Sequence, residues 1–206
     1  MDLVLATRNG HKIREIRAFL KSLQGLDIYS VLDFSDYHSP PETGKTFEEN
    51  AYLKGEDVAK KLGKWALADD SGLIVPTLGG MPGIYSSRYS REGGSDKENC
   101  NKLLKEMERL DGEDRFAYFE CCIVLVSPDR DFCKVETGYC EGMIAKQARG
   151  GNGFGYDPVF IKHDYHQTFA ELGEVLKNQI SHRAKALEKI TLTLDKLLHN
   201  PRSLVT

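Results

Sequence analysis

The sequence predicts an α/β protein with a mixed β-sheet. In both halves of the chain, short apolar runs of strand length alternate with segments whose apolar residues recur every three or four positions, as on one face of a helix. Two long apolar segments, 116–126 and 132–140, are joined by a Ser-Pro-Asp-Arg turn, which is typical of a hairpin. A hairpin within this alternating order makes the sheet mixed rather than purely parallel.

The first third of the chain reads as strand, helix, strand, helix. We expect strands at 3–6 and 27–32, with a helix between them that carries Ile13, Ile16 and Leu20 on one face. Thr46-Phe47-Glu48-Glu49 has the Thr-x-x-Glu pattern of a capping box and predicts a helix that runs to about Leu62.

The remaining elements follow the same signals. A strand at 65–68 is expected to end at Asp69-Asp70-Ser71-Gly72. Ser95-Asp96-Lys97-Glu98 is a second capping box, ahead of a helix that reaches about Leu110. After the hairpin and a glycine-rich loop at 147–155 come a short strand at 158–161 and a last helix that starts after Ser181.

Composition excludes several classes of protein. The 206 residues suit one large domain or two lobes that share a core. The net charge of −3 argues against a non-specific nucleic-acid binder. The longest apolar run, 121–126, is far too short to span a bilayer, and the first residues lack the basic region of a signal peptide. Five cysteines without a C-x-x-C pair favour reduced thiols in the cytoplasm.

The loop 7–12 follows a strand and opens a helix, so backbone N–H groups and the positive helix end would face an anion there. Thr7, Asn9 and Lys12 add donors and charge. The P-loop pattern is absent, and many strand-to-helix turns look similar. By itself the loop is therefore a weak indication of phosphate binding.

Charged residues in unusual places form a second indication. Asp69 and Asp70 repel each other after an apolar strand, so at least one of them could bind a divalent cation or a basic partner. The alternative, a solvated turn with Asp and Gly in their usual places, stays equally open. Glu42, on another loop, is a possible second acid. Lys54 falls on the apolar stripe of its helix, where it either extends its stem to solvent or aims its charge into a cleft.

The segment 150–157, Gly-Gly-Asn-Gly-Phe-Gly-Tyr-Asp, allows close approach of the backbone to a ligand. Its two aromatic residues could stack on a flat base and Asp157 could accept hydrogen bonds from one, whereas the alternative is a flexible hairpin loop. His182 and Arg183 open the final helix, where cations oppose the helix dipole and an anionic or carbonyl-bearing ligand would offset them. Lys177 adds a donor nearby.

Six motifs together resemble one family, the Ham1/RdgB-type inosine/xanthosine triphosphate pyrophosphatases, from Leu3 to about Leu187. The motifs are LATRNGHK at 5–12, ETGKTFEENA at 42–51, ADDSGL at 68–73, LGGMPGIYSSRY at 78–89, GFGYDPVF at 153–160 and SHRAKAL at 181–187. Their number and order make the resemblance highly specific.

The resemblance implies a fold, an activity and a setting. The fold would be an elongated mixed sheet flanked by helices, a single Ham1-like domain over 1–206 with two lobes around a central substrate cleft. The activity would be Mg²⁺-dependent hydrolysis of ITP, dITP and XTP to the monophosphate and pyrophosphate. The protein would be a cytoplasmic homodimer that binds neither nucleic acid nor membranes.

The matching positions give these expected roles to particular residues. The triphosphate would be bound by Thr7, Arg8, Asn9, Gly10, His11 and Lys12. Substrate would also contact Ser71, and the purine would be read by Phe154, Gly155, Tyr156, Asp157, Lys177, His182 and Arg183. Asp70 would act as base and hold Mg²⁺ together with Glu42, while Lys12 and Lys54 would face the phosphates.

In the expected reaction a metal-ordered water attacks the α-phosphorus and pyrophosphate leaves. A donor from His182 or Arg183 to the 6-oxo group would reject adenine, which has an amino group there, although GTP shares the 6-oxo group. Two other functions stay open: a nucleotide sensor without turnover, and a phosphatase that releases orthophosphate from the γ position.

Overall fold

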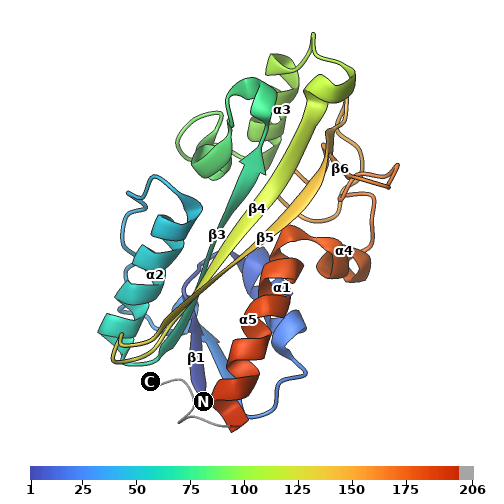
Figure 1. The fold of residues 1–206 in the computed structure, drawn as a ribbon. Coiled ribbons are helices and arrows are strands. Elements are labelled where there is room, and N and C mark those ends of the chain that lie inside the picture. The colour runs from blue at the N-terminus through green and yellow to red at the C-terminus, as the bar shows by residue number, and fades with distance from the viewer. Residues whose placement is uncertain (200–206) are drawn as a thin grey trace. The chain divides into compact units, whose positions relative to one another are not determined.

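The computed structural model describes residues 1–199 and contains a six-stranded sheet in the order β2-β1-β3-β4-β5-β6 (Figure 1). Strand β1 pairs in parallel with both β2 and β3, whereas β5 and β6 are antiparallel, so the predicted mixed sheet is confirmed. The strands are β1 (Asp2–Leu5), β2 (Asp27–Ser30), β3 (Trp65–Ile74), β4 (Phe116–Val126), β5 (Cys133–Ile144) and β6 (Phe160–Lys162).

Five α-helices accompany the sheet in the described part of the chain: α1 (Gly10–Leu20), α2 (Phe47–Leu62), α3 (Asp96–Glu106), α4 (Glu174–Ile180) and α5 (His182–His199). The chain divides into two compact units. Among the described residues, the first contains 1–70, 121–138 and 183–199, and the second contains 71–120 and 139–182. Strands β3, β4 and β5 contribute residues to both units.

The core of the first unit lies on one face of its strands. Alternate residues of a strand point to opposite faces, and Leu67 on β3 and Ile123 on β4 face Ile16 of α1 and Ile190 of α5 in one buried cluster. On the other face, α2 approaches closely at Gly55, where an added Cβ would lie 3.1 Å from Val126. Figure 1 shows α2 on one side of these strands and α1 with α5 on the other.

The core of the second unit joins α3 to the far ends of the strands. Leu103 of α3 and Met107, the residue that follows this helix, pack in one buried cluster with Leu73 of β3, Phe119 of β4 and Phe160 of β6. The rings of Phe119 and Phe160 meet edge to face with their centroids 4.7 Å apart. This packing fixes α3 against the sheet. The loop between β5 and β6 contacts α3 at Gly155.

Helix starts follow the predicted capping residues. Thr46 accepts a hydrogen bond from the Glu49 N–H, and α2 begins at the next residue. The Glu49 carboxylate accepts from the Lys45 N–H at 2.6 Å, so the reciprocal half of this capping box is shifted by one residue. At α3 the full box is formed between Ser95 and Glu98.

Several predicted boundaries are wrong. Strand β3 does not end at Asp69 but runs through the acid pair to Ile74, because ion pairs satisfy the buried carboxylates. Strand β5 extends to Ile144, past the predicted end at 140. The strand predicted at 27–32 stops at Ser30 and continues as a 3-10 turn, and α4 was not predicted.

Candidate functional site

Each unit carries one group of side chains that the sequence singles out. In the first unit, Asp69 on β3 is surrounded by cations. Its Oδ2 lies 2.9 Å from Nζ of Lys12 and accepts hydrogen bonds from Nε and Nη2 of Arg183, at 3.2 and 3.1 Å. Arg183 also forms an ion pair with Glu15 of α1. Asp69 is 1 % exposed, so these interactions act in a desolvated setting.

The neighbouring carboxylate is held by a different cation. Nζ of Lys54 lies 3.0 Å from Oδ1 of Asp70 and 3.1 Å from Oε1 of Glu42. Lys54 is 9 % exposed and Asp70 8 %, whereas Glu42 is exposed on the loop before α2. Of the two interpretations of Lys54, the stem that extends to solvent is wrong, because the ammonium is buried between two carboxylates.

The charges in this group shift one another's pKa values. Burial raises the pKa of Asp69, but the positive charges of Lys12, Arg183 and Lys54 outweigh burial and hold that pKa below its usual range. Burial also raises the pKa of Asp70; Lys54 and Lys12 oppose this effect and Glu42 adds to it, so the pKa of Asp70 lies above its usual value. The two adjacent acids therefore differ in character.

The loop 7–12 places backbone donors at the start of α1. Asn9 caps the helix, since its Oδ1 accepts hydrogen bonds from the N–H groups of His11 and Lys12 at 2.9 and 3.3 Å. Thr7 Oγ1 accepts from the Asn9 N–H at 3.2 Å. Arg8, Asn9, Gly10 and His11 are exposed, so the loop is open to an anion in solution.

The residues present fit a magnesium ion. Glu42 and Asp70 already converge on a single cation, the ammonium of Lys54. Oδ1 of Asp69 is buried and has no hydrogen-bond partner among the described residues. Within residues 1–199 no three His, Cys, Asp or Glu side chains form a metal-binding group. Mg²⁺ fits this set, because it commonly takes one or two carboxylates and completes its shell with water and substrate phosphates.

The second unit groups an aromatic ring with a buried ion pair. Asp157 accepts hydrogen bonds at Oδ2 from the Phe154 N–H, at 2.8 Å, and from Nζ of Lys177. The same ammonium lies 4.6 Å from the centroid of the Phe154 ring. An added Cβ at Gly153 would lie 2.0 Å from this carboxylate, so Gly153 has to be glycine. The glycine-rich segment thus forms a turn in which a buried ion pair and a backbone hydrogen bond meet at Asp157.

The side chain of Tyr156 faces the protein core and not the surface of the turn. The side chain is 3 % exposed and belongs to the hydrophobic core of the second unit. Its hydroxyl donates a hydrogen bond to the carbonyl of Ser86 at 2.9 Å. Tyr156 therefore fixes the turn to the core of the second unit. Of the two aromatic residues in the turn, only Phe154, which is half-buried, has exposed surface.

His182 is buried at the start of α5 and stacks on a ring that sequence reasoning missed. The imidazole lies parallel to Phe119 of β4, with centroids 4.6 Å apart and planes at 10°. Its neighbour Arg183 belongs to the carboxylate group of the first unit. Ser71 follows Asp70 on β3 and is half-buried.

Both the sequence and the fold are similar to those of known proteins. The model of the Ham1 family matches residues 3–192. The chain belongs to the Ham1 family. A Chlamydia caviae protein named dITP/XTP pyrophosphatase is 52 % identical over 199 residues, 96 % of each chain. The structure of a HAM1 protein from Coxiella burnetii matches with a TM-score of 0.86 and 40 % identity, covering 95 % of this chain and 99 % of that one.

Ham1-family membership confirms the resemblance on which the site residues were assigned, and the structure brings eight of the seventeen assigned residues into two groups. Lys12, Glu42, Lys54, Asp70 and Arg183 gather around Asp69 in the first unit. Phe154, Asp157 and Lys177 are in contact in the second. Tyr156 stands apart in the core, and the expected role of Arg183 toward the purine stays a prediction.

Sequence reasoning missed several residues that complete these Ham1-family groups. Glu15 carries no local signal beyond its place on a helix, yet it is buried and pairs with Arg183. Phe119 was treated only as part of a strand. Asp96 and Cys100 on α3 contact the backbone of Gly155. Only long-range structure reveals these partners.

Proposed function

We propose that this chain hydrolyses non-standard purine nucleoside triphosphates, namely dITP, XTP and ITP, to the monophosphate and pyrophosphate. The observation that carries the proposal is the buried array in which Lys54 bridges Glu42 and Asp70 beside the Lys12–Asp69 ion pair. Such an array supplies carboxylates for a divalent cation and ammonium groups for phosphates. The relatives named dITP/XTP pyrophosphatase, at about 50 % identity over nearly the whole chain, support the same activity.

The charge of this array suits a complex of metal and polyphosphate. The array has a formal net charge of −1, because it contains four carboxylates and three cations: Glu15, Glu42, Asp69 and Asp70 with Lys12, Lys54 and Arg183. A bound Mg²⁺ changes that sum to +1. The array alone is therefore a poor site for a polyanion, and the same array with its metal attracts one.

Glu42 and Asp70 are the residues that would hold Mg²⁺, which supplies positive charge against the phosphates and acidifies a bound water. Asp70 accepts a proton from the attacking water, whose oxygen bonds to the α-phosphorus. The bond from the α-phosphorus to the bridging oxygen breaks, and pyrophosphate leaves with that electron pair. Lys12 and Lys54 offset the charge that develops on the phosphate oxygens. The exposed loop 7–12, at the positive end of α1, binds the remaining phosphate charge.

The group in the second unit reads the base. Phe154 stacks on the purine. A 6-oxo purine accepts a hydrogen bond at O6, and Lys177, His182 and Arg183 are the donors assigned to the base. Adenine carries a 6-amino group, so a donor aimed at that position leaves both groups unpaired and disfavours ATP. Replacement of His182 by Ala tests this step, because loss of the donor lowers the preference for ITP over ATP.

The test of the proposed function is a turnover assay with ITP, XTP, dITP, GTP and ATP in the presence of Mg²⁺. Pyrophosphate and orthophosphate are measured separately. Pyrophosphate from ITP, XTP and dITP, with little from ATP and GTP, supports the proposal. Orthophosphate as the product indicates a phosphatase acting on the γ position, and tight binding without product indicates a sensor.

The proposed setting is the reducing cytoplasm, with the protein as a homodimer. All five cysteines are free, and Cys133 is exposed while the others are buried. Within residues 1–199 no helix combines the length and apolar character needed to cross a membrane. Light scattering coupled to size-exclusion chromatography tests the dimer, since a mass near twice 23.2 kDa is expected.

A further inference from the structure

The turn that carries Phe154 and Asp157 contains three glycines with positive φ. Gly150, Gly153 and Gly155 have φ values of +80°, +76° and +60°. Glycine loses more conformational freedom on folding than any other residue, so a turn built on three of them is costly to order. Whatever fixes this turn also fixes the two side chains assigned to the base.

Helix α3 supplies such contacts at Gly155. The Gly155 N–H donates a hydrogen bond to Oδ2 of Asp96 at 2.7 Å, and the Gly155 carbonyl accepts one from Sγ of Cys100 at 3.3 Å. Residues four positions apart on a helix lie on the same face, so one turn of α3 holds both peptide groups that flank Gly155. The capping box of Ser95 and Glu98 fixes the start of this helix turn.

At Gly155, Asp96 provides a hydrogen-bond acceptor for the N–H and Cys100 provides a donor for the carbonyl. A carboxylate accepting from a backbone N–H forms a charge-assisted bond, which is stronger than a neutral one. Burial raises the pKa of the Cys100 thiol to about 12, with the negative charges of Asp96 and Asp157 adding to the effect. The thiol therefore keeps its proton at neutral pH and can donate it to the Gly155 carbonyl.

The anchor at Tyr156 does not replace these contacts. Its hydroxyl is bonded to Ser86 deep in the core and fixes the side chain of residue 156. The peptide between Phe154 and Gly155 is held on both sides, because its carbonyl accepts a hydrogen bond from the Asp157 N–H at 3.2 Å and its N–H donates to Asp96. Without Asp96 only the longer contact on the carbonyl side is left to hold its orientation. A change in the orientation of that peptide would move the Phe154 ring relative to Lys177 and weaken the hydrogen bond that the Phe154 N–H donates to Asp157.

We propose that Asp96 and Cys100 are positioning residues for base recognition, which hold Gly155 so that Phe154 and Asp157 keep their places beside Lys177. Neither residue is assigned a contact with substrate. The inference rests on the proposed function, because it refines how the same site reads its purine. It predicts that loss of the α3 contacts weakens binding of the base while binding of the phosphates is unchanged.

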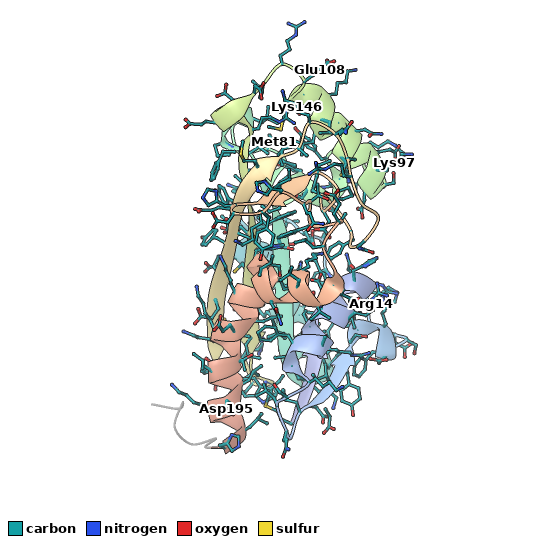
Figure 2. The ribbon with its side chains drawn as sticks, turned by 90° about the vertical axis from the view of Figure 1, so that its right-hand side faces the viewer. Arg14, Met81, Lys97, Glu108, Lys146 and Asp195 are labelled. Carbon is teal, nitrogen blue, oxygen red and sulfur yellow. The ribbon has the colours of Figure 1, made fainter. Side chains whose placement is uncertain are left out.

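The experiment compares Asp96→Ala, Asp96→Asn, Cys100→Ala and Cys100→Ser with the wild-type protein. We measure KM and kcat for dITP, the Kd for dIMP by calorimetry, and the inhibition constant of inorganic pyrophosphate. Lys97→Ala is the matched control. Lys97 lies between Asp96 and Cys100 in the first turn of α3, and its side chain points into solvent (Figure 2).

For Asp96→Ala we expect KM for dITP and the Kd for dIMP to rise about tenfold, with kcat within about twofold and pyrophosphate inhibition unchanged. Asp96→Asn keeps an acceptor and restores most of the affinity. Cys100→Ala has a smaller effect of about threefold, and Cys100→Ser, which keeps a donor, reverses it. Lys97→Ala behaves as wild type.

Two outcomes overturn the inference, and they are distinguishable from failure of the proposed function. Unchanged dIMP affinity in Asp96→Ala removes the positioning role while wild-type turnover of dITP still supports the proposed function. Equal weakening of dIMP and pyrophosphate shows general destabilisation and also removes it. Absence of dITP and XTP turnover in the wild type refutes the proposed function, and the positioning role falls with it.

Discussion

The ammonium of Lys54 is shared between two carboxylates that come from different segments, with Nζ 3.0 Å from Asp70 and 3.1 Å from Glu42. Burial lowers the pKa of Lys54, but Asp70, Asp69 and Glu42 outweigh it and raise that pKa, so the side chain stays charged. Lys54 thus holds together the two acids proposed to bind Mg²⁺. This arrangement gives the array a cation of its own when the metal is absent.

Replacing Lys54 by Met leaves Asp70 and Glu42 without their shared cation. Removal of one partner from a buried ion pair costs about 3 kcal/mol of unfolding free energy. We expect Mg²⁺ to restore part of this loss by taking the place of the ammonium, so millimolar Mg²⁺ raises the Tm of Lys54→Met more than that of wild type.

Lys61→Met is the matched control for this prediction, because Lys61 lies on the same helix and pairs with Asp57 at an exposed position. Its loss costs about 0–1 kcal/mol and is insensitive to Mg²⁺. The Tm of wild type, Lys54→Met and Lys61→Met is measured by thermal unfolding with and without Mg²⁺. An equal Mg²⁺ effect on Lys54→Met and wild type would contradict the placement of the metal at Glu42 and Asp70.

Asp70→Asn removes the proposed base while keeping the size of the side chain. We expect kcat for dITP to fall by at least about 100-fold, since a positioned general base contributes about that much or more. Asp195→Asn on the exposed face of α5 (Figure 2) is the control and leaves kcat unchanged. Steady-state kinetics at saturating Mg²⁺ measures kcat for both variants. A kcat near that of wild type in Asp70→Asn would contradict the role of Asp70 as general base.

Tyr156→Phe and Phe154→Ala separate the two aromatic residues of the turn. Loss of the Tyr156 hydroxyl leaves the Ser86 carbonyl without that donor and lowers the free energy of unfolding by about 1–2 kcal/mol, with KM for dITP unchanged. Phe154→Ala removes the stacking ring and raises KM about tenfold. Urea unfolding and steady-state kinetics test both. A comparable rise in KM for Tyr156→Phe would show that it contacts the base.

The pKa of Glu98 gives the stability of α3 a defined pH dependence. The Ser95 N–H, then Arg91 and the Ser95 hydroxyl, lower this pKa to about 2. A carboxylate with a lowered pKa adds stability above its unfolded value near 4.5, and that contribution is lost as pH falls toward 2. We expect wild type to be more stable than Glu98→Ala at pH 7 and the gap to shrink by pH 3, as measured by urea unfolding.

Local patterns in the sequence predict the parts of the fold that local chemistry controls. Thr46 and Ser95 mark the starts of α2 and α3 because their side chains cap the next turn. Helix α4 escapes such reasoning, since it has seven residues and Val175 and Leu176 on it are exposed, which leaves no apolar stripe to detect.

In the candidate site, too, sequence reasoning identifies some residues, whereas the surroundings of others depend on contacts between distant parts of the chain. The resemblance identifies Asp70, Lys54 and Glu42, but Asp69 looks locally like part of a turn because acids and glycine favour turns. Its actual place in a buried strand depends on Arg183, 114 residues away in the chain. The pairing of Arg183 with Glu15 spans 168 residues and has no local signature at all.

The contact between Gly153 and Asp157 also limits which amino acids residue 153 can become during evolution. Any side chain at residue 153 would meet the Asp157 carboxylate at 2.0 Å and would require a φ of +76°, so every replacement is penalised twice. Gly151, two residues earlier, has open space around its Cα and no such φ. In a pool of random variants selected for activity, codon 151 should diversify while codon 153 remains glycine.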